Sequence, residues 1–167
     1  MKVLFLDIDG VLNSEQSCVF WHNKRDQSKW ENEMYTSWTG SLKEYLALEF
    51  CPIAVSNVEE LMRRVPELKI VVSSTWRLGE TVESLKAMFK PFKLISDAIV
   101  GVTPSIRLTP RGNEIQAWLD KHPEVTRFVI VDDDMDMEHL VDKLIQTSPI
   151  HGFLYGDMLK AVGILNG

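Results

Sequence analysis

The chain has 167 residues and a mass of 19.1 kDa, which at roughly 150 residues per domain predicts one domain spanning residues 1–167. Its 24 acidic and 18 basic side chains give a net charge of −6, so bulk charge does not attract nucleic acid. No apolar run approaches the roughly 18 residues of a membrane span, and the first apolar stretch meets Asp7 too early for a signal peptide. We therefore expect a cytoplasmic protein with an ordinary hydrophobic core.

Three short apolar strands are predicted at 3–6, 69–72 and 127–131, and each ends abruptly in polar residues. Their near-continuous apolar character indicates a parallel sheet that is buried on both faces. Helices are predicted between and after these strands from apolar stripes at helical spacing: Val58, Leu61, Met62 and Val65; Val82, Leu85, Met88 and Phe89; Ile115, Trp118 and Leu119; and Met137, Leu140, Val141 and Leu144. The alternation predicts an α/β, Rossmann-like, three-layer domain with a central parallel sheet.

Two of these helices have recognisable starts. Ser56 or Asn57 is a suitable N-cap for the first helix, and Thr109-Pro110 is typical of a start for the third.

Residues 13 to about 50 differ from the rest, because polar and aromatic side chains occur together without a clean period. This stretch is expected to be a cap or loop inserted after the first strand. Its aromatic and basic residues include Trp21, Trp30, Tyr35, Trp38, His22, Lys24, Arg25 and Lys29. Stacking platforms beside positive charge are one way to hold single-stranded nucleic acid, while a small hydrophobic cluster under a long loop is the simpler interpretation.

The polar strand ends are the predicted ligand site, because ligands bind outside the carboxyl ends of the strands in an open parallel sheet. The ends read Asp7-Ile8-Asp9-Gly10, Ser73-Ser74-Thr75 and Asp132-Asp133-Asp134. If the three strands are neighbours, five carboxylates converge, and such a cluster ionises only when a cation neutralises it. Hard oxygen ligands suit Mg2+, which takes one or two carboxylates together with a substrate phosphate. The sequence therefore predicts a magnesium and phosphate site.

Carboxylates in this setting have a defined chemistry. Asp7 is positioned to attack phosphorus, and Asp9 to act as general acid and then as general base. The Ser73 hydroxyl, nearby backbone N–H groups and a cationic side chain are expected to hold the phosphoryl oxygens. As alternatives, Ser73 caps a strand end, and Asp134 and Asp136 begin a solvated helix.

The phrase Phe5-Leu6-Asp7-Ile8-Asp9-Gly10-Val11-Leu12-Asn13 resembles motif I of the haloacid dehalogenase (HAD) superfamily of phosphohydrolases, and the later strand ends follow the order of its other motifs. The resemblance implies that Asp7 is the nucleophile and Asp9 the acid/base. It also implies that Ser73, with Ser74, binds the phosphoryl group. The implied Mg2+ ligands are Asp7, the backbone carbonyl of Asp9, and Asp133, with Asp132 supporting.

Motif III of that superfamily normally supplies a lysine, and this chain has none in the window. Arg111, 22 residues before Asp133, is the expected substitute, and Arg107 is the reserve candidate. The phrases at 72–77 and 111–119 resemble compact HAD domains found alone or attached to RNA-repair proteins, and the phosphatase modules of polynucleotide kinase-phosphatases. A site role and a structural role for Arg77 are equally open, while Trp118 is interpreted as core.

The resulting hypothesis is a Mg2+-dependent phosphohydrolase that acts through an aspartyl phosphate on a phosphomonoester, either a nucleic-acid end phosphate or a nucleotide. The alternative is a non-enzymatic phosphate- and metal-binding module, such as a receiver-like signalling domain. A receiver carries its acidic pair first, its phosphorylated aspartate in the middle and a lysine late. Here the Asp-x-Asp comes first and no late strand-end lysine is evident. The sequence makes no prediction of oligomeric state.

Overall fold

The structure, a computed structural model, describes residues 1–24, 47 and 49–167. Within these residues, five strands form one parallel sheet in the order β3-β2-β1-β4-β5. The strands are β1 (Lys2–Leu6), β2 (Lys69–Val72), β3 (Ile99–Val102), β4 (Arg127–Asp132) and β5 (Leu144–Gln146). The three predicted strands are therefore neighbours, with β1 in the middle. The short outer strands β3 and β5 were not predicted from the sequence.

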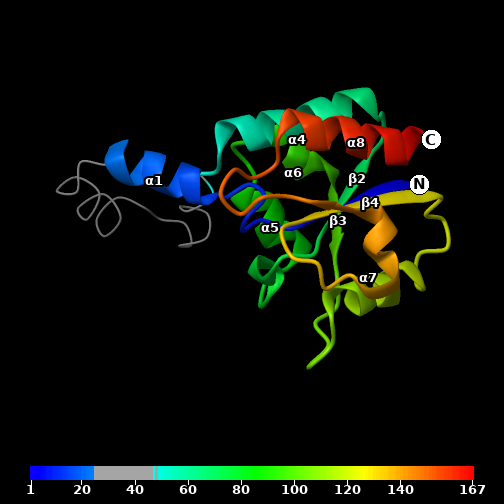
Figure 1. The fold of residues 1–167 in the computed structure, drawn as a ribbon. Helices are drawn as coiled ribbons and strands as arrows, with labels where there is room; N and C mark the ends of the chain where they lie inside the picture. The colour runs from blue at the N-terminus through cyan, green and yellow to red at the C-terminus, as the bar shows by residue number, and fades with distance from the viewer. Residues whose placement is uncertain (25–46, 48) are drawn as a thin grey trace.

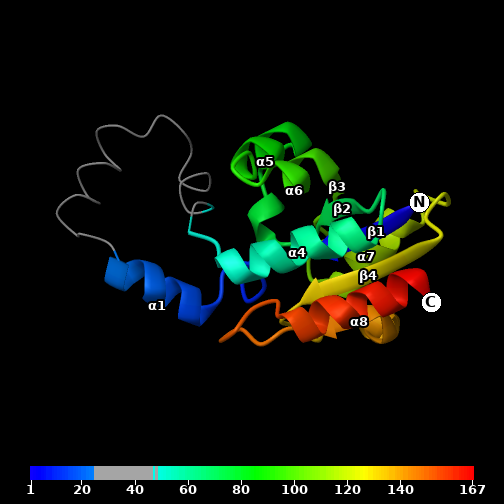
Figure 2. The same cartoon turned by 90° about the horizontal axis from the view of Figure 1, so that it is seen from above.

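Helices cover both faces of the sheet (Figures 1 and 2). On one face, α4 (Pro52–Arg64) packs beside α8 (Tyr155–Asn166). The other face carries α7 (Arg111–Leu119) and the 3₁₀ helix η2 (Glu138–Lys143). The remaining elements after β2 are the short 3₁₀ helix η1 (Thr75–Arg77), α5 (Val82–Met88) and α6 (Lys93–Ala98). This is the three-layer α/β fold predicted from the sequence.

Strand β1 shows why the central strands are apolar throughout. Leu4 and Leu6 lie in the core beneath α4 and α8, and Val3 and Phe5 lie in the core beneath α7. Successive side chains of a strand point to opposite faces, so a strand covered on both sides has no face left for polar residues. Trp118 of α7 packs edge-on against Phe5 with ring centroids 5.5 Å apart, which confirms its interpretation as core.

Helix α4 begins earlier than predicted. Its first residue is Pro52 and its N-cap position is Cys51, so neither Ser56 nor Asn57 caps it. Proline suits the first turn because its missing N–H has no intrahelical partner there. Asn57 is instead buried, and its side-chain amide donates to the carbonyl of Phe153 at 2.9 Å.

The helix predicted from the stripe at 137–144 is wrong. The chain forms the 3₁₀ helix η2 and then enters β5 at Leu144. Three residues per turn bury Met137 and Leu140 on one line and leave Val141 46% exposed. Leu144 pairs with Ile130 of β4, so strand pairing accounts for the last member of the stripe.

The insertion after β1 begins with helix α1 (Glu15–Lys24), which projects beyond the edge at which the central strands end (Figures 1 and 2). The backbone N–H of Glu15 donates to the carbonyl of Pro149 at 2.9 Å, which ties the helix start to the loop after β5. Trp30, Tyr35 and Trp38 lie outside the described residues, so their expected place in a cap stays a prediction. No helix in the described part of the chain is both long and apolar enough to cross a membrane.

Candidate active site

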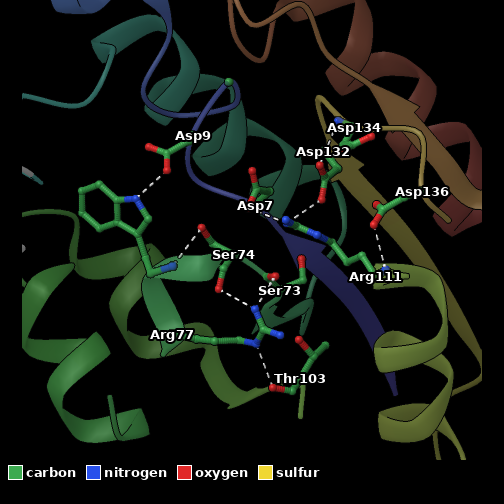
Figure 3. A network of polar contacts seen from close by, with 12 residues as sticks. Asp7, Asp9, Ser73, Ser74, Arg77, Thr103, Arg111, Asp132, Asp134 and Asp136 are labelled. Atoms are coloured by element: carbon green, nitrogen blue, oxygen red, sulfur yellow. Dashed lines mark hydrogen bonds and ion pairs between the residues drawn. The ribbon is translucent and has the colours of Figure 1, made fainter. Parts of the chain in front are cut away.

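The candidate site lies at the carboxyl ends of the three central strands (Figure 3). Asp7 follows β1, Ser73 follows β2, and Asp132 is the last residue of β4. The backbone N–H of Asp7 donates to the carbonyl of Val131 at 3.0 Å, and that of Ser73 donates to Leu6 at 3.0 Å. The ladder thus continues one residue past the strands, and it places the three polar side chains at one edge.

Three carboxylates form an acidic cluster at this edge. Asp7, Asp132 and Asp133 each offer an oxygen, and these oxygens lie within 4.8 Å of one another. Burial raises the pKa of Asp7 and of Asp133, and it raises the pKa of Asp132 to about 7, with the charge of Asp7 adding to the effect. The cluster therefore carries more negative charge than its surroundings stabilise, which favours a bound cation.

Arg111 supplies positive charge to the cluster. Its Nη1 donates to Asp7 Oδ1 at 2.7 Å and to Asp132 Oδ2 at 2.9 Å. Arg107, the reserve candidate, is exposed, and within the described residues its side chain has no hydrogen bond or ion pair with the acidic cluster. The structure therefore brings Arg111, and not Arg107, onto the predicted nucleophile.

The start of α7 is held in place by Asp136. The backbone N–H of Arg111 donates to Asp136 Oδ2 at 3.0 Å, and that of Gly112 donates to the Asp136 carbonyl at 3.0 Å. A Cβ on Gly112 would overlap the carbonyl of Met137, so only glycine permits this approach. The interpretation of Asp136 as the start of its own helix is therefore corrected, because it caps α7, which precedes it in the chain.

The serines after β2 are both fully buried. Ser73 Oγ has no hydrogen-bond partner among the described residues, whereas Ser74 Oγ accepts from the backbone N–H of Trp76 at 3.3 Å. A buried hydroxyl without a partner is costly, and a ligand that bonds to it removes that cost. Ser73 thus offers a free donor beside Asp7.

Asp9 does not join the acidic cluster through its carboxylate. Its Oδ2 accepts from Trp76 Nε1 at 2.9 Å, and its Oδ1 accepts from Asn13 Nδ2 at 3.2 Å. Asp134 is exposed and accepts from the backbone N–H of Met135 at 2.6 Å. The expectation that all five carboxylates converge is therefore wrong. Three of them converge, those of Asp7, Asp132 and Asp133, and those of Asp9 and Asp134 lie outside the cluster.

The turn after β1 explains the position of Asp9. Gly10 has a φ of +70°, in the left-handed region that favours glycine, and a Cβ there would overlap the Asp133 side chain. The turn therefore presses its backbone against Asp133 while the Asp9 carboxylate faces Trp76. Figure 3 shows Asp9 to one side of the group formed by Asp7, Asp132 and Arg111.

Arg77 has a structural role in this arrangement. Its guanidinium donates to the carbonyls of Ser73, Ser74, Thr103 and Pro104 and to the Glu114 carboxylate, at distances from 2.5 to 3.2 Å. These bonds use every N–H donor of the group. Arg77 thus fastens the serine loop to the start of the loop after β3 and, through Glu114, to α7. None of these five bonds goes to the acidic cluster.

The roles of Trp76, Asn13 and Asp136 were not predicted from the sequence. Asn13 stood within the motif I phrase and Trp76 directly after the serines, but no spacing rule connects either residue to Asp9. The Trp76–Asp9 bond spans 67 residues and the Asp136–Arg111 bond spans 25. Both depend on loop paths that residue type and period do not encode.

The sheet order, the Asp-x-Asp turn after the central strand and the acidic pair after its neighbour are those of a HAD-type α/β domain. A family model described as the HAD domain in Swiss Army Knife RNA repair proteins matches residues 3–157. The chain belongs to this family, and the resemblance to HAD domains of RNA-repair proteins is confirmed. Membership indicates, in general terms, a phosphohydrolase with a divalent metal and a phosphorylated substrate. Comparison with curated proteins gave no match, and comparison with solved structures gave none either.

Proposed function

We propose that this domain is a Mg2+-dependent phosphatase that hydrolyses a phosphomonoester through an aspartyl phosphate on Asp7. The observation that carries the proposal is the acidic cluster of Asp7, Asp132 and Asp133 with Arg111 bound to two of its members. A cation site and an anion site then share the edge at which phosphoryl groups bind in α/β sheets.

The donor set fits Mg2+, which prefers carboxylate and carbonyl oxygens. Asp7, Asp133 and the backbone carbonyl of Asp9 would hold the ion, with Asp132 supporting. The raised pKa values of Asp7 and Asp132 support this assignment, because one guanidinium does not balance three carboxylates. When bound, the ion neutralises charge on the carboxylates and on the phosphoryl oxygens.

The phosphoryl group would be held by donors that the protein leaves available. Within the described residues, the Arg111 side chain bonds only through Nη1, so its other nitrogens can donate to phosphoryl oxygens. The unpartnered Ser73 hydroxyl is a second donor, and the neighbouring Ser74 completes the predicted serine pair. These groups position phosphorus for attack by an Asp7 carboxylate oxygen.

Asp9 would complete the reaction as acid and base. In the first step a bond forms between Asp7 and phosphorus, the bond from phosphorus to the leaving oxygen breaks, and Asp9 gives that oxygen a proton. In the second step Asp9 takes a proton from water, whose oxygen attacks phosphorus and releases phosphate and the Asp7 carboxylate. Its exposed position suits contact with a leaving group, whereas buried Asp7 suits attack.

We infer a nucleic-acid end phosphate as the favoured substrate, with a nucleotide monophosphate as the other candidate. The family's description as a domain of RNA repair proteins supports the first. The test is a panel of oligonucleotides with 3′- or 5′-phosphates beside the matching mononucleotides. Preference for an oligonucleotide end supports the first assignment, and equal or greater kcat/KM for mononucleotides contradicts it.

The mechanism is tested by phosphate release from 4-nitrophenyl phosphate with and without Mg2+. Asp7→Asn should reduce release to background. Asp9→Asn should lower kcat by about 10²-fold to 10⁴-fold, because attack of water on the Asp7 phosphate needs the base whatever the leaving group was. Asp134→Asn is the matched control, because Asp134 lies beside the cluster but outside it, and its activity should stay near that of the wild type. No release from any substrate by a folded wild-type protein contradicts the proposal and favours the non-enzymatic, receiver-like alternative.

A further inference from the structure

The Asp9 carboxylate is held by two side-chain donors from different parts of the chain, one on each oxygen. We propose that Trp76 is a positioning residue, whose indole N–H aims Asp9 at the leaving-group oxygen. This inference rests on the proposed function, because it assumes that Asp9 transfers the proton. The role assigned to Trp76 is indirect, because it acts on the reaction through the direction of the Asp9 carboxylate.

Trp76 is well placed for this role because its own position is fixed from two sides. It lies in η1, two residues after Ser74, and its backbone N–H donates to Ser74 Oγ at 3.3 Å. Its ring packs against Phe50 with centroids 5.7 Å apart, and Phe50 is 2% exposed. The indole therefore offers a donor at a fixed point, and it ties Asp9 to the serine loop.

Phe50 connects this support to the end of the inserted segment. Its ring also contacts Phe89 and Phe92, with centroids 5.5 Å and 6.0 Å apart. The backbone N–H of the next residue, Cys51, donates to the carbonyl of Leu12 at 2.7 Å. The aromatic support of Trp76 is thus anchored both in the core and in the loop that carries Asp9.

Asn13 provides the second donor, and its amide orientation is defined by its other bonds. Its Oδ1 accepts from the Cys18 thiol at 3.0 Å, which leaves Nδ2 to donate to Asp9. Its backbone N–H donates to Ile8 at 3.0 Å, and its carbonyl accepts from Gly10 at 2.9 Å. Asn13 therefore moves with the turn that carries Asp9, whereas Trp76 comes from a different loop.

This difference gives Trp76 the larger effect on the direction of Asp9. An exposed aspartate on a turn is free to rotate about its side-chain bonds, and a donor within the same turn does not fix it relative to the substrate. A donor from the serine loop does, because Ser73 in that loop is also the expected phosphoryl ligand. Proton transfer depends on such alignment, and small displacements slow it markedly.

The test compares Trp76→Phe with the wild type on two substrates. Phenylalanine keeps an aromatic ring against Phe50 and removes the N–H donor. With phenyl phosphate, whose leaving group needs the proton, kcat/KM should fall about 10-fold to 100-fold. With 4-nitrophenyl phosphate, whose leaving group departs readily as an anion, the fall should be much smaller, and KM should be nearly unchanged for both substrates.

Two further variants separate the possible causes of a change. Asp9→Asn should show the same substrate dependence in stronger form, and it reports on the proposed function independently of Trp76. Trp118→Phe makes the same substitution in α7, where the ring packs in the core away from Asp9. Any fall in kcat/KM in this variant should be equal for the two substrates. If kcat/KM of Trp76→Phe falls equally for both substrates, or does not fall, the positioning role is overturned. The result for Asp9→Asn can still support the mechanism in that case.

A measurement that keeps Trp76 in place covers the case in which Trp76→Phe does not fold. The indole N–H signals of the five tryptophans are recorded by NMR in the wild type and in Asp9→Ala. Loss of the acceptor should move the Trp76 indole signal and speed its exchange with solvent more than it does for Trp118. An unchanged Trp76 signal overturns the inference.

Discussion

Two arginines with low solvent exposure lie near the carboxyl edge of the sheet, and they are used differently. The side chain of Arg77 is 5% exposed and that of Arg111 is 17% exposed. All the N–H donors of the Arg77 guanidinium form hydrogen bonds, to four backbone carbonyls and one carboxylate. Arg111 bonds two carboxylates through a single nitrogen, as far as the described residues show.

Their electrostatic settings differ in the same way. Arg77 has one carboxylate partner, Glu114, and burial lowers its pKa. Burial also acts to lower the pKa of Arg111, but the charges of Asp132 and Asp7 outweigh it and the pKa is raised. A saturated, balanced arginine holds loops together, whereas an arginine with spare donors beside excess negative charge is available to a ligand.

Arg77→Met is expected to give the largest loss of stability. It leaves the Glu114 carboxylate buried without its partner, which should lower the free energy of unfolding by about 3–5 kcal/mol. Urea unfolding of the metal-free protein measures the change. Arg63→Met is the control, because Arg63 forms exposed ion pairs on α4 and should cost at most about 1 kcal/mol. Equal losses in the two variants would remove the distinction between Arg77 and a surface arginine.

Arg111→Met should instead act mainly on catalysis. Loss of a charged donor to the phosphoryl group is expected to lower kcat/KM by about 10²-fold to 10³-fold. Stability should fall less than in Arg77→Met, because the raised pKa values of Asp7 and Asp132 let them take up protons. Arg107→Met is the matched control, and steady-state kinetics on both variants decide between the arginines. A comparable loss in Arg107→Met would transfer the role to Arg107.

The charge imbalance at Arg111 predicts that the stability of the protein depends on pH. The pKa of Asp132 is about 7 in the folded protein against 3.8 as the reference value, so between these values the folded state holds more protons. Stability of the metal-free protein should therefore be greatest below about pH 4 as far as this group is concerned, and it should fall by on the order of 4 kcal/mol as pH rises to 7.

Added Mg2+ should reverse that trend, because a cation favours the ionised carboxylates. Thermal unfolding with and without Mg2+ at pH 5 and pH 8 measures this, and the stabilisation should be larger at pH 8. Asp132→Asn should weaken the pH dependence of the metal-free protein. Equal stabilisation by Mg2+ at both pH values would argue against coupling between the cation and these carboxylates.

The fold could be predicted where burial dictates residue type. The strands β1, β2 and β4 lie between two helical layers, so their apolar runs are unmistakable. The outer strand β3 alternates buried and exposed residues over four positions, and β5 has three residues. Segments this short contain too few residues to show a strand period. At 137–144, a 3₁₀ helix followed by a strand has apolar residues at the same spacing as an α-helix, which is why a helix was predicted there.

The site could be predicted to the extent that it follows from parallel strands. Strand ends of a parallel sheet meet at one edge, which is why Asp7, Ser73 and Asp132 were expected together and lie together. The direction of Asp9 depends on the Gly10 turn and on Trp76, and these are set by loop geometry. The support of Arg111 by Asp136 is of the same kind, since it joins two loops across a helix start.

Asp136→Ala tests that support and carries the smallest of the expected effects. Pro110, at the N-cap position of α7, has no side-chain cap bond, so Asp136 supplies the acceptor for the first N–H of the helix. Its loss should lower the free energy of unfolding by about 1 kcal/mol. Asp134→Ala is the control, because its bond stays within its own loop, and it should cost at most about 0.5 kcal/mol. If Asp136 also positions Arg111, its variant should raise KM for phosphomonoesters while Asp134→Ala leaves KM unchanged. A loss of stability without a change in KM would limit Asp136 to holding the helix.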